Sequence, residues 1–366
     1  MKIVFILPDL RAGGAEKVCI NLATDWVAKG HYVKFILMNK KGEYLKNISK
    51  KIKIVSLKKK KLRQIFFPLL TFFRNDKPDA ILAQMWPLTS ITVLAWLASF
   101  KTGKLFLVDH VHLSSSVEKE IFFPKKIFKL IIKLTYLFSN KIIVVSNGVK
   151  KDLVEISNKL NKKIKVIYNP LIKKKKLKIK NKKSLKIKIW GKNIKYRILS
   201  VGSLKIQKDH FNLIEAFSLL KFQKECRLLI IGNGPLKNKL KKFIKIKRLE
   251  NEIIFIDFKS DLQIYYETAD LFVSSSKWEG FSNVIAESLG CGLPVVSTDC
   301  KSGPSEILKR GRYGELVPIE NSKKLALAIE KNLHKKHDKN LLKKRSQDFA
   351  ISKISNKYLK LIKNER

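Results

Sequence analysis

Short apolar segments of strand length recur along the first half of the chain, and stretches with helical periodicity separate most of them. The first segment, residues 2–8, leads into a glycine loop and a helix that we expect to end near Lys29. Alternating strands and helices predict a mainly parallel sheet that is covered by helices on both faces. The further strands of this half are expected at 32–38, 52–57, 80–84, 104–108, 141–145 and 164–168.

The same alternation starts again at residue 196, after a lysine-rich segment that contains few acidic residues. Strands are expected there near 196–201, 228–231, 253–256 and 270–273, and the chain beyond 318 is helical. A length of 366 residues is enough for two domains. The pattern therefore predicts an α/β chain of two Rossmann-like, doubly wound domains. We place them at 1–170 and 196–350, joined by a lysine-rich linker at 171–195 and followed by a last helix at 351–366.

The segment from Asp270 onward combines an apolar strand, a turn and the start of a helix. Ser282 is a typical N-cap for a helix over 283–289, and Gly280 allows the backbone to approach a ligand closely. The first amides of a helix have no partners within the helix, so they favour a phosphate or another anion.

Two carboxylates stand on either side of this turn. Glu279 precedes it, and Glu287 lies far enough into the helix to reach sugar hydroxyls, as acidic residues do in dinucleotide folds. The arrangement suits a nucleotide diphosphate that carries a second sugar. The alternative is a buried strand, turn and helix with two surface glutamates.

The spacing of Glu279 and Glu287 resembles the E-x7-E signature of retaining glycosyltransferases of the family-4 type, and segments 292–298 and 302–307 match the same family. The resemblance implies a GT-B fold, with an acceptor-binding first domain facing a nucleotide-sugar-binding second domain across a cleft. It also implies that the last helix crosses back to the first domain. The positions that it assigns to donor binding are Gly280, Phe281, Ser282, Asn283 and Glu287, and Glu279 is assigned a catalytic role.

The first domain supplies three further candidates through the same resemblance. Gly13 and Gly14 match a loop near the donor phosphates, and a tight turn without a ligand is the alternative. His110 follows the strand at 104–108 and matches a catalytic-site histidine directed at the donor sugar. His112 is a second candidate for that position, and the alternative is that neither histidine takes part.

The family commonly holds the donor diphosphate with an arginine and a lysine. Lys208 matches the lysine, whereas Ser203 stands where the arginine is common. One charged contact of the family is therefore missing, although Ser203 offers a hydroxyl and Lys205 a nearby charge.

The net charge of +47 comes from 77 Lys and Arg residues, of which only 10 are Arg, against 30 acidic residues. Arginine is the preferred residue for reading phosphates in two contacts, so the lysine excess argues against a dedicated nucleic-acid-binding protein. The alternative explanation of this excess is lysine- and isoleucine-rich codon usage in an AT-rich genome. In either case such a surface is attracted to anionic lipid headgroups.

Two segments have the composition of basic amphipathic helices with aromatic flanks, which suits binding to a membrane surface. They span residues 58–74 and 121–138. Packing of their apolar sides on the sheet is the alternative. The longest uncharged run, 80–100, is interpreted as a strand plus a helix, with a membrane-spanning segment as the alternative.

The chain opens directly on a strand, so no signal peptide is expected, and its four cysteines show no metal-ligand spacing. We expect a cytoplasmic protein with reduced thiols that is peripheral at the inner face of the cell membrane. No metal site and no cofactor are expected, because the D-x-D triplet that holds a metal in the other major glycosyltransferase fold is missing.

The expected function is metal-independent transfer of a hexose or N-acetylhexosamine from a nucleotide diphosphate sugar, with retention implied by the resemblance alone. A UDP-linked donor is favoured by its frequency in the family. The expected acceptor is a lipid-linked or lipopolysaccharide glycan, as in bacterial surface-polysaccharide biosynthesis. The alternatives are a basic nucleic-acid-binding protein and a catalytically inactive scaffold that binds a nucleotide sugar.

Overall fold

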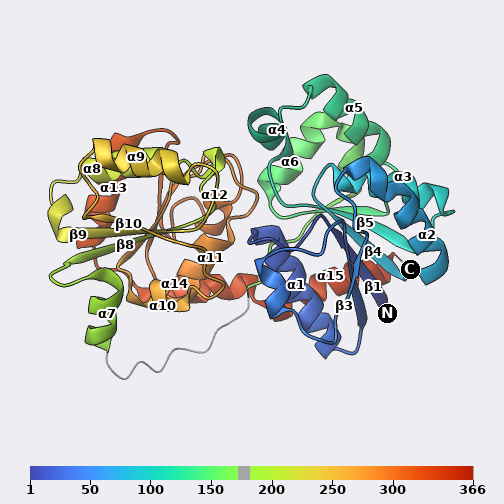
Figure 1. Ribbon diagram of the computed structural model, residues 1–366, viewed down its shortest axis with the longest axis horizontal. Coiled ribbons are helices and arrows are strands. Elements are labelled where there is room, and N and C mark those ends of the chain that lie inside the picture. Colours follow the sequence, from blue (N-terminus) through green and yellow to red (C-terminus); the bar gives the residue numbers. More distant parts are fainter. Residues whose placement is uncertain (172–181, 366) are drawn as a thin grey trace. The chain divides into compact units, whose positions relative to one another are not determined.

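The computed structural model describes residues 1–171 and 182–365, and these form two compact units (Figure 1). Unit 1 comprises Met1–Ile172 together with Phe349–Arg366, and unit 2 comprises Lys173–Asp348. Each unit is built on one parallel sheet that carries helices, so the predicted α/β fold class is confirmed.

Unit 1 contains a seven-stranded sheet in the order β3-β2-β1-β4-β5-β6-β7. Its central strands are buried along almost their whole length and are apolar except at their ends, as expected for a parallel sheet that helices cover on both faces. The strands are β1 (Lys2–Leu7), β2 (Tyr32–Leu37), β3 (Lys53–Ser56), β4 (Ala80–Gln84), β5 (Lys104–Asp109), β6 (Lys141–Val144) and β7 (Ile164–Val166).

The helices of unit 1 include a row in which α3 packs between α2 and α5 (Figure 1). Another pair, α1 and α15, joins the two ends of the chain: the Trp26 indole donates to Ser355 Oγ at 2.8 Å and its ring lies beside Tyr358. The helices are α1 (Gly14–Ala28), α2 (Phe66–Asp76), α3 (Leu88–Ala98), α4 (Leu113–Ser116), α5 (Lys125–Tyr136), α6 (Asn147–Ile156) and α15 (Ile351–Asn364).

Unit 2 contains a six-stranded sheet in the order β10-β9-β8-β11-β12-β13. The strands are β8 (Tyr196–Val201), β9 (Cys226–Ile231), β10 (Ile253–Ile256), β11 (Leu271–Ser274), β12 (Val295–Thr298) and β13 (Glu315–Val317). The helices are α7 (Lys182–Trp190), α8 (His210–Ser218), α9 (Lys237–Ile246), α10 (Gln263–Thr268), α11 (Asn283–Gly290), α12 (Pro304–Ile307), α13 (Ser322–His334) and α14 (Lys339–Ser346).

The predicted linker at 171–195 differs in part from the structure. Residues 172–181 lie outside the described residues, but 182–190 form helix α7. Trp190 ends this helix, is buried, and donates from its indole to Thr268 Oγ1 at 3.0 Å. One large aromatic side chain thus anchors a segment whose many lysines had indicated a solvated linker.

The uncharged run at 80–100 is divided as predicted into strand β4 and helix α3. Across the described residues, no helix is both long enough and apolar enough to cross a bilayer.

Candidate active site

The strand order of each sheet reverses once, and ligands of doubly wound sheets bind at the carboxyl ends of the strands at this point. In unit 2 the reversal lies between β8 and β11, which are hydrogen-bonded neighbours. The loops that follow these strands are joined by three contacts. Ser275 Oγ donates to the Lys208 carbonyl at 2.8 Å, the Lys277 amide donates to the Gln207 carbonyl at 2.8 Å, and the Gln207 side chain donates to the Trp278 carbonyl at 3.0 Å.

These contacts bring two candidates together. Lys208 Nζ lies 2.5 Å from Glu279 Oε1, although 71 positions separate the residues in the sequence. Glu279 is only 4% exposed and also accepts from Ser276 Oγ at 2.7 Å. A carboxylate as buried as this needs a cation and a hydrogen-bond donor, and it has both. The pair places a lysine and a glutamate at the strand-order reversal.

The aliphatic part of Lys208 lies against Gly202, at the end of β8. A Cβ added to Gly202 would be 3.3 Å from Cγ, Cδ and Cε of Lys208, which is tighter than ordinary packing. Sequence reasoning missed the role of this glycine, because its importance depends on a side chain six residues later. Ser203 stands in the same loop between Gly202 and Lys208.

Ser282 occupies the N-cap position of α11, as predicted, but its side chain makes no capping hydrogen bond to the helix. Its backbone is left-handed, with φ 69° and ψ 73°, and this conformation is costly for a serine. The Ser282 hydroxyl is buried and has no hydrogen-bond partner among the residues that the structure describes. Strained backbone and an unpaired hydroxyl at a helix start are typical of a ligand contact.

The remaining candidates of unit 2 surround Ser282. Gly280 and Phe281 are buried, and Gly303 packs so closely on Phe281 that an added Cβ would lie 2.5 Å from the Phe281 carbonyl oxygen. Asn283 and Glu287 are partly exposed on α11, where Glu287 Oε2 accepts from the Tyr266 hydroxyl at 3.2 Å. The candidate residues of unit 2 thus lie in the connections that follow β8 and β11, and in α11.

In unit 1 the candidate His110 follows β5 and is 8% exposed. Its Nε2 lies 2.8 Å from Gln84 Oε1, at the end of β4, and burial lowers the pKa of its imidazole to about 4. His112, the other histidine considered, caps α4 by accepting from the Ser115 amide at 3.4 Å and lies 3.5 Å from Asp152. His112 therefore already has a structural role.

Asp109, beside His110, is fully buried, and burial raises the pKa of its carboxyl to about 7. It accepts a hydrogen bond from the Tyr136 hydroxyl at 3.2 Å, which in turn lies 2.9 Å from Thr89 Oγ1. Sequence reasoning gave Asp109 no role, because a carboxyl at a strand end gives no sign of whether a helix will cover it.

Gly13 and Gly14 lie at the start of α1, directly after the loop that follows β1. The Glu16 carboxylate lies over Gly13, and a Cβ added there would be 2.0 Å from Glu16 Oε2. The strand order of this sheet reverses between β1 and β4, so the glycines, which follow the β1 loop, and Gln84, which ends β4, lie at that reversal. Three candidates, Gly13, Gly14 and His110, thus belong to unit 1 and all others to unit 2.

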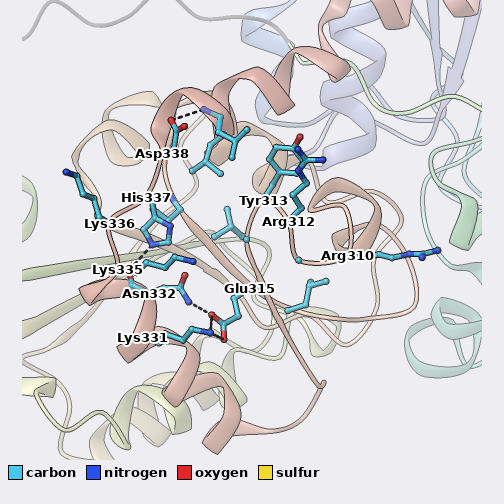
Figure 2. A pocket seen from close by; sticks show the side chains of 17 residues that line it. Arg310, Arg312, Tyr313, Glu315, Lys331, Asn332, Lys335, Lys336, His337 and Asp338 are labelled. Carbon is cyan, nitrogen blue, oxygen red and sulfur yellow. Dashed lines mark hydrogen bonds and ion pairs between the residues drawn. The ribbon is translucent and has the colours of Figure 1, made fainter.

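A hollow of about 420 Å³ in unit 2 lies elsewhere, at the amino ends of β12 and β13 (Figure 2). Its carboxylates already have partners: Glu315 accepts from Asn332 at 2.7 Å and pairs with Lys331, while Asp338 accepts from the first amides of α14. No candidate residue lines this hollow. It is therefore separate from the site at the carboxyl ends of the strands.

Metal-binding side chains do not gather in the described part of the chain: no three His, Cys, Asp or Glu residues there are placed to hold an ion. The four cysteines are free, and burial raises the pKa of the Cys226 thiol to about 12.

Comparison with known proteins gives matches along nearly the whole chain. The family profile described as glycosyl transferases group 1 matches residues 182–349, and that described as Glycosyltransferase Family 4 matches residues 12–172. From Campylobacter jejuni, the N-acetylgalactosamine-N,N'-diacetylbacillosaminyl-diphospho-undecaprenol 4-alpha-N-acetylgalactosaminyltransferase is 30% identical, over 99% of both chains. A second enzyme of that organism, an alpha-1,4-N-acetyl-D-galactosaminyltransferase, is 25% identical over 99% of this chain and 98% of its own. Among solved structures, HepE of Anabaena in complex with UDP and glucose has a TM-score of 0.83 and 19% identity, and each chain is covered completely. This last likeness identifies the fold as GT-B.

Proposed function

This chain belongs to the group 1 and family 4 glycosyltransferases, and on that premise we propose that it transfers a hexose or N-acetylhexosamine from a nucleotide diphosphate sugar to a glycan hydroxyl. The observation that carries the proposal is the pairing of Lys208 with Glu279 at the strand-order reversal of unit 2. Doubly wound sheets bind nucleotides at this place.

The donor diphosphate is proposed to bind between Lys208 and the start of α11. Lys208 supplies the positive charge, and Ser203 and Ser282 supply hydroxyls. The buried, unpaired Ser282 hydroxyl supports this assignment, because a phosphate oxygen would give it the acceptor that it lacks within the described residues. Gly280, Phe281 and Asn283 shape the turn, and Glu287 accepts hydrogen bonds from hydroxyls of the nucleoside sugar.

In the proposed reaction the bond between the sugar C1 and the diphosphate oxygen breaks, and the acceptor oxygen forms a bond to C1 on the same face. The proton of the acceptor hydroxyl passes to the departing diphosphate. Negative charge grows on the diphosphate as it leaves, so the Lys208 ammonium and the α11 amides favour the transition state over the bound donor. We propose that these groups act without a metal ion. Glu279 is proposed to hold Lys208 in place and to contact the reacting sugar. His110 and the loop of Gly13 and Gly14 are proposed to contact the donor or the acceptor.

UDP is the proposed nucleotide, and a lipid-linked glycan is the proposed acceptor. HepE of Anabaena, which shares the fold, was solved with UDP and with UDP-glucose. The names of both Campylobacter jejuni relatives include a glycan that is linked to undecaprenol through a diphosphate. A role in building a surface polysaccharide of the cell envelope would follow from these two substrates.

We further propose that unit 1 docks on the cytoplasmic face of an anionic membrane through helix α5. This helix buries Phe128, Ile132 and Tyr136 and leaves a second apolar row uncovered. Ile127, Leu130 and Leu134 of that row are 50–59% exposed, Phe138 just after the helix is 52% exposed, and Phe122 before it is 78% exposed. The alternative expected from the sequence, packing of this row on the sheet, does not fit these exposures.

Exposed lysines lie on α5 beside the apolar row, and their positive charge favours an anionic membrane as the partner. Lys126, Lys129 and Lys133 are exposed on the same helix. An apolar row accompanied by cations is complementary to an anionic lipid surface, which takes up both groups at once. The other segment expected to bind membranes is less suitable, because α2 buries Leu69 and Phe73 and leaves only Phe67 largely exposed.

The donor proposal is tested by calorimetric titration of the purified protein with UDP, GDP and ADP in the absence of metal. Micromolar binding of one nucleotide that is weakened by Lys208→Ala and by Glu287→Ala would support the site. A useful control is Lys241→Ala, an exposed lysine on α9. If the folded protein binds none of the three nucleotides, the transferase proposal fails.

The two alternatives make different predictions. Neither the family nor the scattered lysines favour a nucleic-acid-binding protein, and we propose no nucleic-acid partner. An inactive scaffold, suggested by Ser203 in place of arginine, should keep its cellular role when Glu279 is replaced, whereas an enzyme should lose it.

A further inference from the structure

His110 has one ring nitrogen in a defined hydrogen bond and one without any. Its Nε2 lies 2.8 Å from Gln84 Oε1. Its Nδ1 is buried and has no hydrogen-bond partner among the described residues. The two nitrogens of a neutral imidazole differ, since one carries the proton and the other a lone pair, so the partner of Nε2 decides what Nδ1 can do.

The orientation of the Gln84 amide is itself fixed. Its Nε2 donates to the Leu82 carbonyl at 3.2 Å, so its Oε1 must be the atom that faces the histidine. With the amide reversed, an oxygen would face the Leu82 carbonyl oxygen, and neither could donate. Because Oε1 can only accept, the Nε2 of His110 has to carry the proton.

The other ring nitrogen then keeps its lone pair. Burial lowers the pKa of His110 to about 4, so the ring is neutral at pH 7. A neutral ring with its proton on Nε2 has an unprotonated Nδ1, which is a hydrogen-bond acceptor. A buried acceptor without a partner is rare, and a ligand hydroxyl would satisfy it.

From these contacts we infer that Gln84 is a positioning residue, which holds His110 as its Nε2–H tautomer so that Nδ1 accepts a hydrogen bond from a hydroxyl of the bound sugar. This inference rests on the proposed function, because it supplies the sugar. Met85, directly after Gln84, has a left-handed backbone with φ 62°, a costly conformation that ends β4 at the strand-order reversal of unit 1. Gln84 thus lies where a doubly wound sheet meets its ligand.

The test is ¹⁵N NMR of histidine-labelled protein, which distinguishes protonated from unprotonated ring nitrogens. The chain has only six histidines, and the His110→Gln variant identifies the signals of His110. In the wild type, we expect a proton on Nε2 that exchanges slowly with water, and a lone pair on Nδ1. A wild-type ring that carries its proton on Nδ1 would overturn the inference.

Two variants of Gln84 then test whether this residue sets the His110 tautomer or only packs against the ring. Gln84→Met keeps the size of the side chain but removes the acceptor, so the Nε2 proton should exchange faster and kcat/KM should fall roughly tenfold. Gln84→Glu keeps an acceptor for the Nε2–H, but its charge favours the imidazolium and its second oxygen faces the Leu82 carbonyl. The Nε2–H signal should therefore remain, while Nδ1 gains a proton and kcat/KM stays low. A Gln84→Met protein with wild-type proton exchange and wild-type kcat/KM contradicts the inference.

Nucleotide affinity separates this inference from the proposed function. UDP is proposed to bind residues of unit 2, so both Gln84 variants should bind it as tightly as the wild type. If the wild type binds no nucleotide, the proposed function fails, while the NMR result still decides whether Gln84 sets the tautomer.

Discussion

Helix α5 gives the sharpest prediction about membrane docking. Replacing Leu130 and Leu134 by serine removes two apolar side chains that are 55% and 59% exposed. Full burial of a leucine contributes about 2 kcal/mol, so covering the exposed half of each contributes about 1 kcal/mol. Losing both should weaken binding to anionic vesicles by about 2 kcal/mol, or roughly thirtyfold in the partition constant.

The lysines of α5 should add a part that depends on salt. Each lysine near an anionic surface contributes on the order of 1 kcal/mol, so replacing Lys126, Lys129 and Lys133 by serine should weaken binding strongly at low salt and less at high salt. The matched control replaces Lys241, Lys242 and Lys245, which are exposed on α9, and lowers the net charge equally. Vesicle sedimentation with and without anionic lipid measures both effects.

Depth of insertion can be read from one introduced tryptophan. All five native tryptophans are buried, so they report little on the protein surface. A tryptophan at position 130 should shift its emission to the blue on anionic vesicles and be quenched by brominated acyl chains.

The docking proposal is refuted if the α5 and α9 variants bind vesicles equally, because general positive charge would then explain all binding. An apolar control, Leu327→Ser on α13, changes a leucine that is 63% exposed in unit 2 and should have no effect. Light scattering detects the other occupant of this face: a dimer that the α5 substitutions dissociate, without a change in vesicle binding, would show that α5 binds a second copy of the chain.

The site and the cores give three further predictions. Glu279→Gln should lower kcat by about a hundredfold while UDP affinity in calorimetry changes little, and a loss of affinity with unchanged kcat would assign Glu279 to binding alone. Gly202→Ala should weaken UDP binding several-fold, because its methyl group displaces Lys208, whereas the control Gly290→Ala meets only ordinary contacts; equal affinities would contradict the packing argument. Burial raises the pKa of Asp109 in the folded state to about 7, above its ordinary value of 3.8. Between these values the folded state keeps a proton that the unfolded state loses, so the free energy of unfolding falls as pH rises from about 4 to 7. Asp109→Asn should therefore be more stable than the wild type at pH 8, by up to about 4 kcal/mol in urea unfolding, with the difference vanishing near pH 4.

The sequence predicted most strands, because their apolar runs are buried on both faces and are bounded by turns, but it did not predict the short strands β12 and β13. The strand near Ala80 and the helix after it were separated within one uncharged run, since Pro87 marks the break. Helix α7 was not predicted, because its stability depends on Trp190 reaching Thr268, a contact between residues 78 positions apart.

The candidate site was also predicted only in part, because some of its features depend on contacts between residues far apart in the sequence. Sequence motifs named Lys208 and Glu279, and the structure brings these side chains into contact. The conformation of Ser282 and the contact from Gln84 to His110 were not predicted, because neither a left-handed serine nor an amide orientation has a sequence pattern of its own. The sequence motifs thus predicted which side chains form the site, whereas the His110 tautomer, the hydrogen-bond partners and the strained Ser282 backbone were found only in the structure.

Helix α15 has a consequence for the order in which the protein can be made. Tyr358 and Ser355 of this helix are buried in unit 1, against α1, yet the ribosome makes them after all of unit 2. While unit 2 is synthesised and begins to fold, the side of α1 that binds α15 therefore stays uncovered. During this time the Trp26 indole lacks its acceptor Ser355. A gene fragment that ends at residue 172 would yield an incomplete core, and a circular permutant that fuses 349–366 ahead of Met1 would supply the missing helix first.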